Sequence, residues 1–340
     1  MPAKRILIFN VNWLGDVLFS TATIRNIRYN FPDSYIACII PSRCYPVLEG
    51  NPNLNELIIF DEKSQHKGML EIMKFTKMLA EKKFDLVYLL HRSMTRALIC
   101  RLAGIPERIG YYTKKRGFLL TQRIVPPNRD AVHRIDYYLN VIQKAGLKAK
   151  DRHTDFFFSS EDRSFSEDFL TRQGLKNTDF LVGINAGGNW DPKRWPKEYW
   201  AKLADRLIRE FNAKVIITGG DKDVELAKSI RDLMHEEPVI ACGLFSLKAF
   251  AALCKRLDLF ITADTGPLHI ANAAGAKKII ALFGPTHQDI TGPVPADNVV
   301  ILGKEIECQI PCYVVDCADN RCMKAISVND VVDQVKRLRK

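Results

Sequence analysis

The strongest constraint on the fold is a repeating alternation of short apolar runs with longer segments whose apolar residues recur every three or four positions. Short apolar runs are typical of buried strands, and the longer pattern is typical of helices that bury one face. Strands that alternate with helices pair in parallel, and helices then cover both faces of the sheet. We therefore expect an α/β protein built on doubly wound sheets.

The alternation occurs twice along the chain. In the first series, strands are expected at residues 4–10, 35–40, 57–60, 85–90 and 108–111, helices at 16–29, 68–82, 93–103 and 131–145, and an irregular connection at 114–129. In the second, strands are expected at 179–185, 214–218, 239–240, 259–262 and 278–283, and helices at 160–173, 197–211, 223–235, 247–254, from 266 onward and at 327–338. A chain of 340 residues is long for one core. The expected domains are 1–150 and 151–325, joined by a polar linker at 148–153 and followed by a C-terminal helix within 326–340.

Positive charge is concentrated in the first series. The formal net charge is +11, and the segment from His91 to Arg134 carries ten Lys or Arg against Glu107 and Asp130, which is +8. Such a concentration indicates an anionic partner, either a phosphorylated substrate, an anionic lipid or a nucleic acid. A solvated basic face is the plain alternative. No segment is typical of a nucleic-acid-binding module, so nucleic acid is not expected as a partner.

Hydropathy points to a cytoplasmic protein, and cysteine spacing decides whether a metal site is expected. No apolar run approaches the roughly 18 residues that cross a bilayer, and the run before Asn10 is too short for the core of a signal peptide. Five of the nine cysteines are scattered and expected in the cores. The other four are Cys308, Cys312, Cys317 and Cys322, separated by three, four and four residues. Because zinc knuckles use closer pairs, a structural loop is favoured, zinc is the weaker alternative, and no metal is expected.

The segment from Asp264 to His269 joins an expected strand to an expected helix. A strand that runs into the N-terminus of a helix presents free N–H groups and the positive end of the helix dipole, which together bind anions. Thr265 and Gly266 begin that helix, and Pro267 suits its first turn. An ordinary turn capped by Asp264 or Thr265 explains the motif alone equally well.

Three further loops are expected at the same sheet edge, at residues 185–193, 219–220 and 284–287. Their glycines allow close approach to backbone N–H groups, and Lys193 adds a mobile positive charge, which is what a diphosphate requires. Glycines that only make tight turns explain any one of these loops. They explain less well why glycine, with Lys or His in three of the four loops, recurs along one edge.

Asp16 follows the first expected strand and stands at the start of a helix. A helix-capping Asp is common there. Alternatively, the carboxylate is a general base that takes the proton of an acceptor hydroxyl as it attacks an activated sugar carbon. Trp13 is then either a wall against which a ligand stacks or a packed loop residue. Two doubly wound domains are expected to face a central cleft, where ligands of such sheets bind.

The order of several motifs resembles glycosyltransferase family 9, the bacterial lipopolysaccharide heptosyltransferases, and most of all its heptosyltransferase II group. The similar segments extend over nearly the whole chain: 6–8 with 14–16, 84–87 with Arg96, 103–110, 187–188 with 193–196, 264–269 and 282–286. Their order and separation are more specific than any one segment.

The resemblance implies a GT-B architecture of two Rossmann-like domains and an inverting transfer that needs neither a metal nor a cofactor. The implied donor is ADP-L-glycero-β-D-manno-heptose, held mainly by the second domain. The implied acceptor is the inner core of lipopolysaccharide (lipid A–Kdo–heptose), held by the first. The basic segment agrees with an anionic lipid A–core acceptor at the inner face of the cytoplasmic membrane, with which the protein is then peripherally associated.

By matching position, the resemblance assigns roles to individual residues. Asp16 is the implied base, and Lys193 neutralises charge on the departing ADP phosphates. The donor-binding candidates, Thr286 being the weakest, are Asn185, Gly187, Gly188, Lys193, Gly219, Asp264, Thr265, Gly266, His269 and Thr286. The acceptor-binding candidates are Trp13, Arg92, Arg96, Lys114, Lys115 and Arg116.

Three other functions remain open. The first is a family 9 glycosyltransferase with a different donor or acceptor. The second is a nucleotide-sugar epimerase on a similar scaffold, which would turn over the donor alone. The third is a non-catalytic protein that binds a nucleotide sugar.

Overall fold

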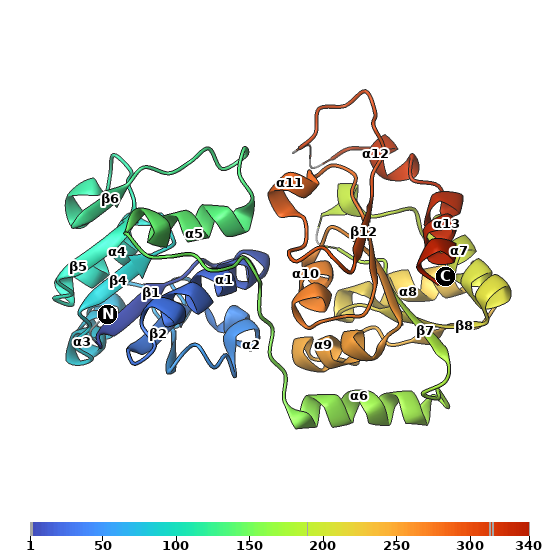
Figure 1. The fold of residues 1–340 in the computed structure, drawn as a ribbon, viewed down its shortest axis with the longest axis horizontal. Coiled ribbons are helices and arrows are strands. Elements are labelled where there is room, and N and C mark those ends of the chain that lie inside the picture. The colour runs from blue at the N-terminus through green and yellow to red at the C-terminus, as the bar shows by residue number, and fades with distance from the viewer. Residues whose placement is uncertain (1–2, 189, 313, 315, 340) are drawn as a thin grey trace. The chain divides into compact units, whose positions relative to one another are not determined.

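The computed structural model describes residues 3–339 except 189, 313 and 315. It divides into two compact units, Met1–Phe157 and Phe158–Lys340, shown in Figure 1. The first unit thus ends at Phe157, whereas the sequence suggested residue 150. Each unit contains a parallel six-stranded sheet with helices on both faces, so the expected pair of doubly wound α/β units is confirmed.

The sheet of the first unit has the strand order β3-β2-β1-β4-β5-β6. Its strands are β1 (Arg5–Phe9), β2 (Tyr35–Ile40), β3 (Glu56–Ile59), β4 (Leu86–Leu89), β5 (Glu107–Tyr111) and β6 (Gln122–Ile124). Its helices are α1 (Leu14–Asn30), α2 (Tyr45–Leu48), α3 (Met69–Glu81), α4 (Met94–Leu102) and α5 (Arg134–Lys144), with short 3-10 turns η1 (Ser42–Cys44) and η2 (Gly117–Leu119). Helix α1 packs against α5, and α3 packs against α4. Right-handed crossovers place these two pairs on opposite faces of the sheet.

The second unit repeats this plan with the order β12-β11-β10-β7-β8-β9. Its strands are β7 (Phe180–Asn185), β8 (Ala213–Thr218), β9 (Val239–Ile240), β10 (Leu259–Ala263), β11 (Ile279–Leu282) and β12 (Val299–Leu302). Its helices are α6 (Ser160–Arg172), α7 (Lys197–Phe211), α8 (Val224–Arg231), α9 (Leu247–Arg256), α10 (Gly266–Ala273), α11 (Gln288–Thr291), α12 (Arg321–Lys324) and α13 (Val328–Leu338), with η3 (Asp191–Lys193) and η4 (Asp221–Asp223). The C-terminal helix α13 packs on α7, and its valines lie in the core.

The central strands are apolar along their whole length because both faces are covered. In β1, paired with β2 and β4, residues Ile6 to Phe9 are buried. In β10, paired with β7 and β11, all five residues are buried. Side chains therefore become available to a ligand only where the strands end, and the carboxyl ends of all six strands lie at one edge of each sheet.

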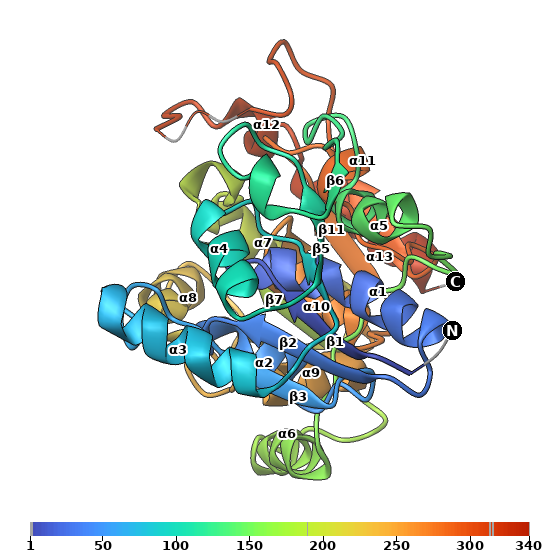
Figure 2. The ribbon, with the colours of Figure 1, turned by 90° about the vertical axis from the view of Figure 1, so that its left-hand side faces the viewer.

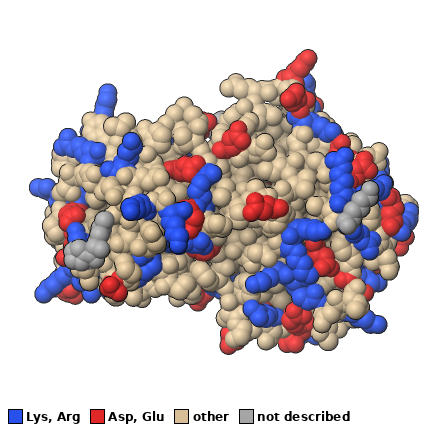
Figure 3. All heavy atoms as spheres, viewed as in Figure 1, with Lys and Arg blue, Asp and Glu red and all other residues tan. Residues whose placement is uncertain are grey.

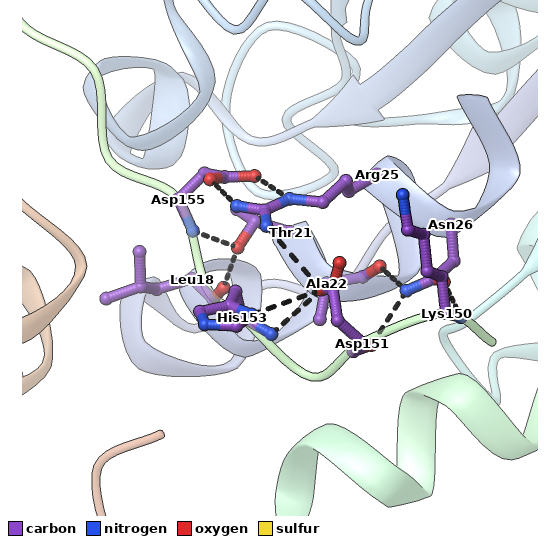
Figure 4. Close-up of polar contacts among 9 residues, drawn as sticks. All are labelled: Leu18, Thr21, Ala22, Arg25, Asn26, Lys150, Asp151, His153 and Asp155. Atoms are coloured by element: carbon purple, nitrogen blue, oxygen red, sulfur yellow. Dashed lines mark hydrogen bonds and ion pairs between the residues drawn. The ribbon is translucent and has the colours of Figure 1, made fainter. Parts of the chain in front are cut away.

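The predicted polar linker is not a loose tether. Residues 150–155 lie along α1, as Figure 4 shows. Asn26 donates to the carbonyl of Asp151 at 3.0 Å, and Thr21 accepts from the backbone N–H of Asp155 at 2.9 Å. The Asp155 carboxylate forms an ion pair with Arg25, whose Nε lies 2.9 Å from Oδ2. The segment predicted as a polar linker at 148–153 is thus bound to the first unit, because α1 carries polar groups that contact it.

Several short elements were missed. The connection predicted as irregular at 114–129 contains η2 and the edge strand β6, and the segment between β11 and α13 contains α11, β12 and α12. Helix α5 begins at Arg134 rather than at 131, and α8 ends at Arg231 rather than at 235. Within the described residues, no helix combines the length and apolarity needed to cross a membrane.

Candidate functional site

The point at which the chain reverses direction across the second sheet lies between β7 and β10. From β7 the chain proceeds to β8 and β9 on one side, and from β10 to β11 and β12 on the other. Ligands of open α/β sheets bind at such a switch point, outside the carboxyl ends of the strands. The loops that follow β7 and β10 meet there, because Lys193 of η3 contacts Asp264 at the end of β10.

The carboxylate of Asp264 is the centre of this contact. Lys193 Nζ donates to Asp264 Oδ2 and to the Asp264 carbonyl, both at 2.8 Å. The hydroxyl of Thr291 donates to Oδ2 at 3.1 Å, and His269 Nε2 lies 3.3 Å from Oδ1. Burial alone raises the pKa of Asp264, but the hydrogen bond from His269 and the charge of Lys193 outweigh it and hold this pKa well below its usual range. Asp264 is therefore a buried anion that fixes the position of the Lys193 ammonium.

Helix α10 begins directly beside this ion pair. Thr265 is at the N-cap and Pro267 is in the first turn, as predicted, but the Thr265 side chain makes no capping hydrogen bond. Its hydroxyl is instead within 3.4 Å of the Ala263 carbonyl, and the Asp264 side chain points to Lys193. Thr265 thus occupies the N-cap position, but its side chain does not make the capping hydrogen bond that the alternative of an ordinary capped turn offered. The Thr265 side chain therefore does not compete with a ligand for the N–H groups at the start of α10.

The glycines after β7 and β8 are required by a close approach of Asp223, in η4. A Cβ at Gly187 would overlap the Asp223 carboxylate, and one at Gly219 would lie 2.7 Å from Asp223 Cβ. The same carboxylate accepts the Gly220 N–H at 3.0 Å. A Cβ at Gly188 would lie 3.2 Å from Thr265, so the loop after β7 also touches the start of α10. Asn189 of this loop lies outside the described residues.

Two other residues predicted to bind the sugar donor, Asn185 and Thr286, are surrounded by neighbouring protein groups. The amide of Asn185 donates to the Thr218 carbonyl at 3.0 Å and so joins the ends of β7 and β8. The hydroxyl of Thr286 is buried and has no hydrogen-bond partner among the described residues. Gly284, in the same loop, is needed because a Cβ there would overlap Met323. The loop after β11 is therefore packed tightly against α12.

The cysteine-rich segment is anchored to two of these loops. The N–H of Cys312 donates to the Pro285 carbonyl at 2.7 Å, and Asn320 donates to the Arg194 carbonyl at 2.9 Å. All four clustered cysteines are free thiols, and Cys308 is exposed. Across the described residues, which include all four, His, Cys, Asp and Glu do not gather into a group of three that could hold a metal. The structure thus gives no support to the zinc alternative and favours an anchoring loop.

The corresponding switch point of the first unit lies between β1 and β4. Asp16 stands there, in the first turn of α1. Its Oδ1 accepts a hydrogen bond from the hydroxyl of Tyr138 at 2.7 Å and lies 3.4 Å from Nη2 of Arg129. Tyr138 is buried, and burial together with the Asp16 charge raises its pKa well above the usual value. Asp16 is held by two donors from the α5 side of the unit and remains partly exposed.

Trp13 and Arg96 lie on the loop side of this site, in different environments. Trp13 is exposed, and its ring centroid lies 5.4 Å from the Arg43 guanidinium. Arg96 is buried and donates to the Asn10 carbonyl at 2.7 Å and to the Asn12 side chain at 2.6 Å. The prediction that Arg96 contacts an acceptor was therefore wrong. Its guanidinium holds the loop after β1 in shape.

Arg116 is also internal. It is 0% exposed, and it donates to the carbonyls of Tyr111 and His91 at 2.6 Å each. Burial and the nearby Arg92 lower the pKa of Arg116 to about 10. The prediction that Arg116 contacts an acceptor was wrong for the same reason. Burial and the charges of Arg96 and Arg116 lower the pKa of His91 to about 4, so its imidazole is neutral at physiological pH.

The basic segment is therefore a weaker surface charge than its composition indicates. Four of its arginines donate to backbone carbonyls: Arg96, Arg108, Arg116 and Arg134. Arg92, Lys114 and Lys115 are exposed and remain available to an acceptor. On the face drawn in Figure 3, Lys and Arg are interspersed with Asp and Glu. The exposed cations of the first unit therefore form small groups among acidic residues on this face.

Comparison with known proteins adds to this geometry. The model of glycosyltransferase family 9 (heptosyltransferase) matches residues 72–321. The chain belongs to glycosyltransferase family 9. The match covers the switch-point site of the second unit but, in the first unit, only the part from α3 onward, so that Asp16 lies outside it. The predicted family is confirmed. The chain is therefore a glycosyltransferase. Membership of the family does not by itself specify the sugar donor or the acceptor.

One relative by sequence and two solved structures are similar to the chain over most of their length. Lipopolysaccharide heptosyltransferase 2 of Escherichia coli is 29% identical over 302 residues, which cover 85% of each chain. The crystal structure of a family 9 glycosyltransferase from Veillonella parvula is 28% identical, with a TM-score of 0.90 over 99% of this chain and 98% of that one. The structure of E. coli ADP-heptose lipopolysaccharide heptosyltransferase II is 23% identical, with a TM-score of 0.79 over 98% of each chain. These likenesses agree with the predicted GT-B fold class.

The family 9 site contains residues that sequence reasoning missed. They are Tyr138 and Arg129 beside Asp16, Thr291 beside Asp264, and Asp223 and Arg194 beside the glycine loop. Arg194 donates twice to the Gly188 carbonyl, at 3.0 and 2.7 Å. Arg194 is adjacent to Lys193, Asp223 follows the Gly219–Gly220 loop by three residues, and Thr291 follows the loop at 284–287. Arg129 and Tyr138 are 113 and 122 residues from Asp16 along the chain, so no local spacing indicates them.

Proposed function

We propose that this protein transfers L-glycero-D-manno-heptose from ADP-heptose to the inner core of lipopolysaccharide, a lipid A–Kdo–heptose acceptor, with inversion and without a metal. Membership of family 9 and the functions of its relatives support this proposal. The observation that carries it is the Lys193–Asp264 pair beside the N-terminus of α10, where the Thr265 side chain makes no capping hydrogen bond. A positive charge and convergent N–H groups at one switch point are suited to a diphosphate.

In this proposal the second unit binds the donor. The β-phosphate of the donor lies at the start of α10. Lys193 Nζ, which Asp264 holds in place, contacts the phosphate there. Positive groups that are fixed before reaction stabilise the negative charge that develops on the departing ADP, which is a major source of catalysis. Asp264 and His269 orient the loop, and the Gly187–Gly188 turn allows the backbone to approach the nucleotide.

The first unit supplies the base and binds the acceptor. The acceptor hydroxyl oxygen bonds to the anomeric carbon as the bond from that carbon to the β-phosphate oxygen breaks, and ADP leaves with the bonding electrons. The hydroxyl proton passes to Asp16. Both described contacts of this carboxylate, with Tyr138 and Arg129, involve Oδ1, so the proton goes to Oδ2. Exposed Arg92, Lys114 and Lys115 bind acidic groups of the acceptor.

The test is transfer by the purified protein from ADP-heptose to defined core acceptors, with the linkage of the product determined. Asp16→Asn is expected to abolish transfer while ADP-heptose affinity, measured by calorimetry, stays unchanged. Lys193→Ala is expected to lose about 2–4 kcal/mol of transition-state stabilisation together with donor affinity. Activity is expected to persist in excess chelator. An absolute need for Mg²⁺ or Mn²⁺, or full activity in Lys193→Ala, would contradict the mechanism.

The same assay distinguishes the alternatives. An epimerase would convert the donor without an acceptor, and a binding protein would bind ADP-heptose without any turnover. A family member with another specificity would transfer from a different nucleotide sugar or to a different acceptor. Each outcome is read directly from the products.

A further inference from the structure

Helices α3 and α4 of the first unit lie side by side, as Figure 2 shows, and both expose apolar side chains. In α3, Met69, Leu70 and Met73 are 73, 73 and 60% exposed, although the opposite side of the helix buries Phe75 and Leu79. In α4 the exposed apolar residues are spaced at every fourth position: Met94, Leu98 and Leu102. The 3-10 turn η2, which contacts α4, adds exposed Phe118.

This clustering is unusual for a soluble surface. Isolated exposed apolar residues are normal, but seven of them on elements that pack against one another indicate an interaction. Each helix already buries an apolar side against the sheet, so the exposed residues are a second apolar side that the core of the unit does not use. We refer to the exposed residues Met69, Leu70, Met73, Met94, Leu98, Leu102 and Phe118 as the α3–α4 surface.

Positive charge borders the α3–α4 surface. The exposed cations on or next to its elements are Lys67, Lys74, Lys77, Arg92, Arg101, Lys114 and Lys115. The acidic residues of α3 are Glu71, which pairs with Lys74, and Glu81, and α4 carries none. A surface of Met and Leu bordered by Lys and Arg is complementary to a bilayer whose headgroups are anionic.

We propose that the α3–α4 surface docks the protein on an anionic lipid bilayer. Met and Leu on the outer sides of two helices insert at the boundary of headgroups and acyl chains, and the flanking lysines extend their ammonium groups to the phosphates. A second copy of the chain fits less well, because a symmetric dimer through this surface would bring two sets of cations together. The charge complementarity therefore favours lipid.

The position of the surface suits a lipid-linked substrate. Helices α3 and α4 each begin at the carboxyl edge of the sheet, since each begins where a strand of the parallel sheet has ended, and Asp16 lies at the same edge. Docking there keeps the acceptor site of the first unit next to the membrane. This last step rests on the proposed function, whereas the docking itself does not.

Flotation with lipid vesicles tests the proposal. The full-length protein is expected to float with vesicles that contain phosphatidylglycerol in phosphatidylcholine, and much less with phosphatidylcholine alone or in high salt. The triple variant M69S/L70S/M73S is expected to lose roughly tenfold or more of its partitioning, because three apolar side chains no longer enter the bilayer. The variant K74E/K77E is expected to lose binding mainly at low salt.

A matched control replaces exposed leucines of the second unit, in L233S/L244S, and is expected to bind like the wild type. Circular dichroism and thermal unfolding verify that the triple variant folds, as expected for such exposed positions. Absent vesicle binding by the wild type, or unchanged binding by the triple variant, overturns the proposal. So does self-association in sedimentation that the triple variant abolishes while vesicle binding is absent.

The same variants separate this inference from the proposed function. Transfer to a soluble, deacylated core oligosaccharide is expected to be unchanged in M69S/L70S/M73S, because these residues lie outside the site. If vesicles bind through the α3–α4 surface but no acceptor is glycosylated, the docking stands and the proposed function fails. If transfer occurs but vesicle binding does not depend on the α3–α4 surface, the proposed function stands and the docking proposal fails.

Discussion

Replacing Asp264 by asparagine tests whether this buried anion organises the site of the second unit. Asparagine keeps the size of the side chain but removes the charge, and its amide nitrogen replaces one acceptor oxygen. In the wild type, three donors surround the carboxylate: Lys193 Nζ at 2.8 Å, Thr291 Oγ1 at 3.1 Å and His269 Nε2 at 3.3 Å. The amide nitrogen cannot accept from any of them.

The expected loss is about 3 kcal/mol in the free energy of unfolding of the second unit. A hydrogen bond to a charged group contributes roughly 1.5–3 kcal/mol, and removing one partner of a buried ion pair costs about 3–5 kcal/mol. The lower end applies because the Lys193 side chain is 20% exposed and can turn toward water. Urea unfolding followed by tryptophan fluorescence measures this loss of stability, since Trp195 and Trp200 are buried in this unit.

The difference from the wild type is expected to depend on pH in one direction. The pKa of Asp264 is well below its usual range in the folded protein, while an unfolded Asp titrates near about 3.9. The stabilisation that the ionised Asp264 carboxylate provides is therefore complete above about pH 3.9 and is lost as the pH falls below the unfolded pKa. At about pH 3 the folded group is still charged, so the difference narrows by about 1.3 kcal/mol.

Thr291→Val is the matched control, because it removes one donor to the same oxygen and leaves the charge. Its expected cost is about 1 kcal/mol, with the same value at neutral and acidic pH. If Asp264→Asn unfolds at the same urea concentration as the wild type, the carboxylate does not organise the loops. A difference that stays constant from neutral pH to about pH 3 would refute the assigned ionisation.

Three further predictions follow from the same kind of contact. Gly187→Ala is expected to cost about 1–3 kcal/mol in stability and to weaken ADP binding in calorimetry, because its Cβ would overlap the Asp223 carboxylate. Tyr138→Phe removes the hydroxyl that Asp16 accepts, so kcat is expected to fall about tenfold, as a charged hydrogen bond allows, while KM changes little; unchanged kcat would remove Tyr138 from the site. Arg116→Met leaves buried carbonyls without donors and is expected to cost about 3 kcal/mol in urea unfolding, whereas the exposed Arg92→Met is expected to change stability by less than about 0.5 kcal/mol.

The fold could be predicted where a strand is buried on both faces. The central strands β1, β4, β7 and β10 are continuous apolar runs, and each was expected within a residue or two. The edge strand β6 was missed because Gln122 and Arg123 are exposed and interrupt the apolar pattern. The run Val299–Leu302 of β12 did carry a signal, but it lies in a long segment of turn-forming residues and was not predicted as a strand.

The site was predictable only in part, because its motifs show where polar residues occur but not what they bind. The strand-to-helix turn at α10 and the contact of Lys193 with its loop depend on local sequence and strand order. The partners of Asp16 depend on the packing of α5 against α1, which no spacing in the sequence records. Charge counting treated Arg96 and Arg116 as surface cations, although burial and backbone carbonyls use both.

The binding of residues 150–155 to α1 fixes the backbone at the end of the first unit. At the start of the second unit, Ser159 caps α6, and the guanidinium of Arg163 lies 5.9 Å from the Phe158 ring. The residues between Asp155 and Ser159 are all phenylalanines. Because Gly-rich tethers are the most flexible connections, ordering this stretch costs less conformational entropy than ordering a Gly-rich tether of the same length.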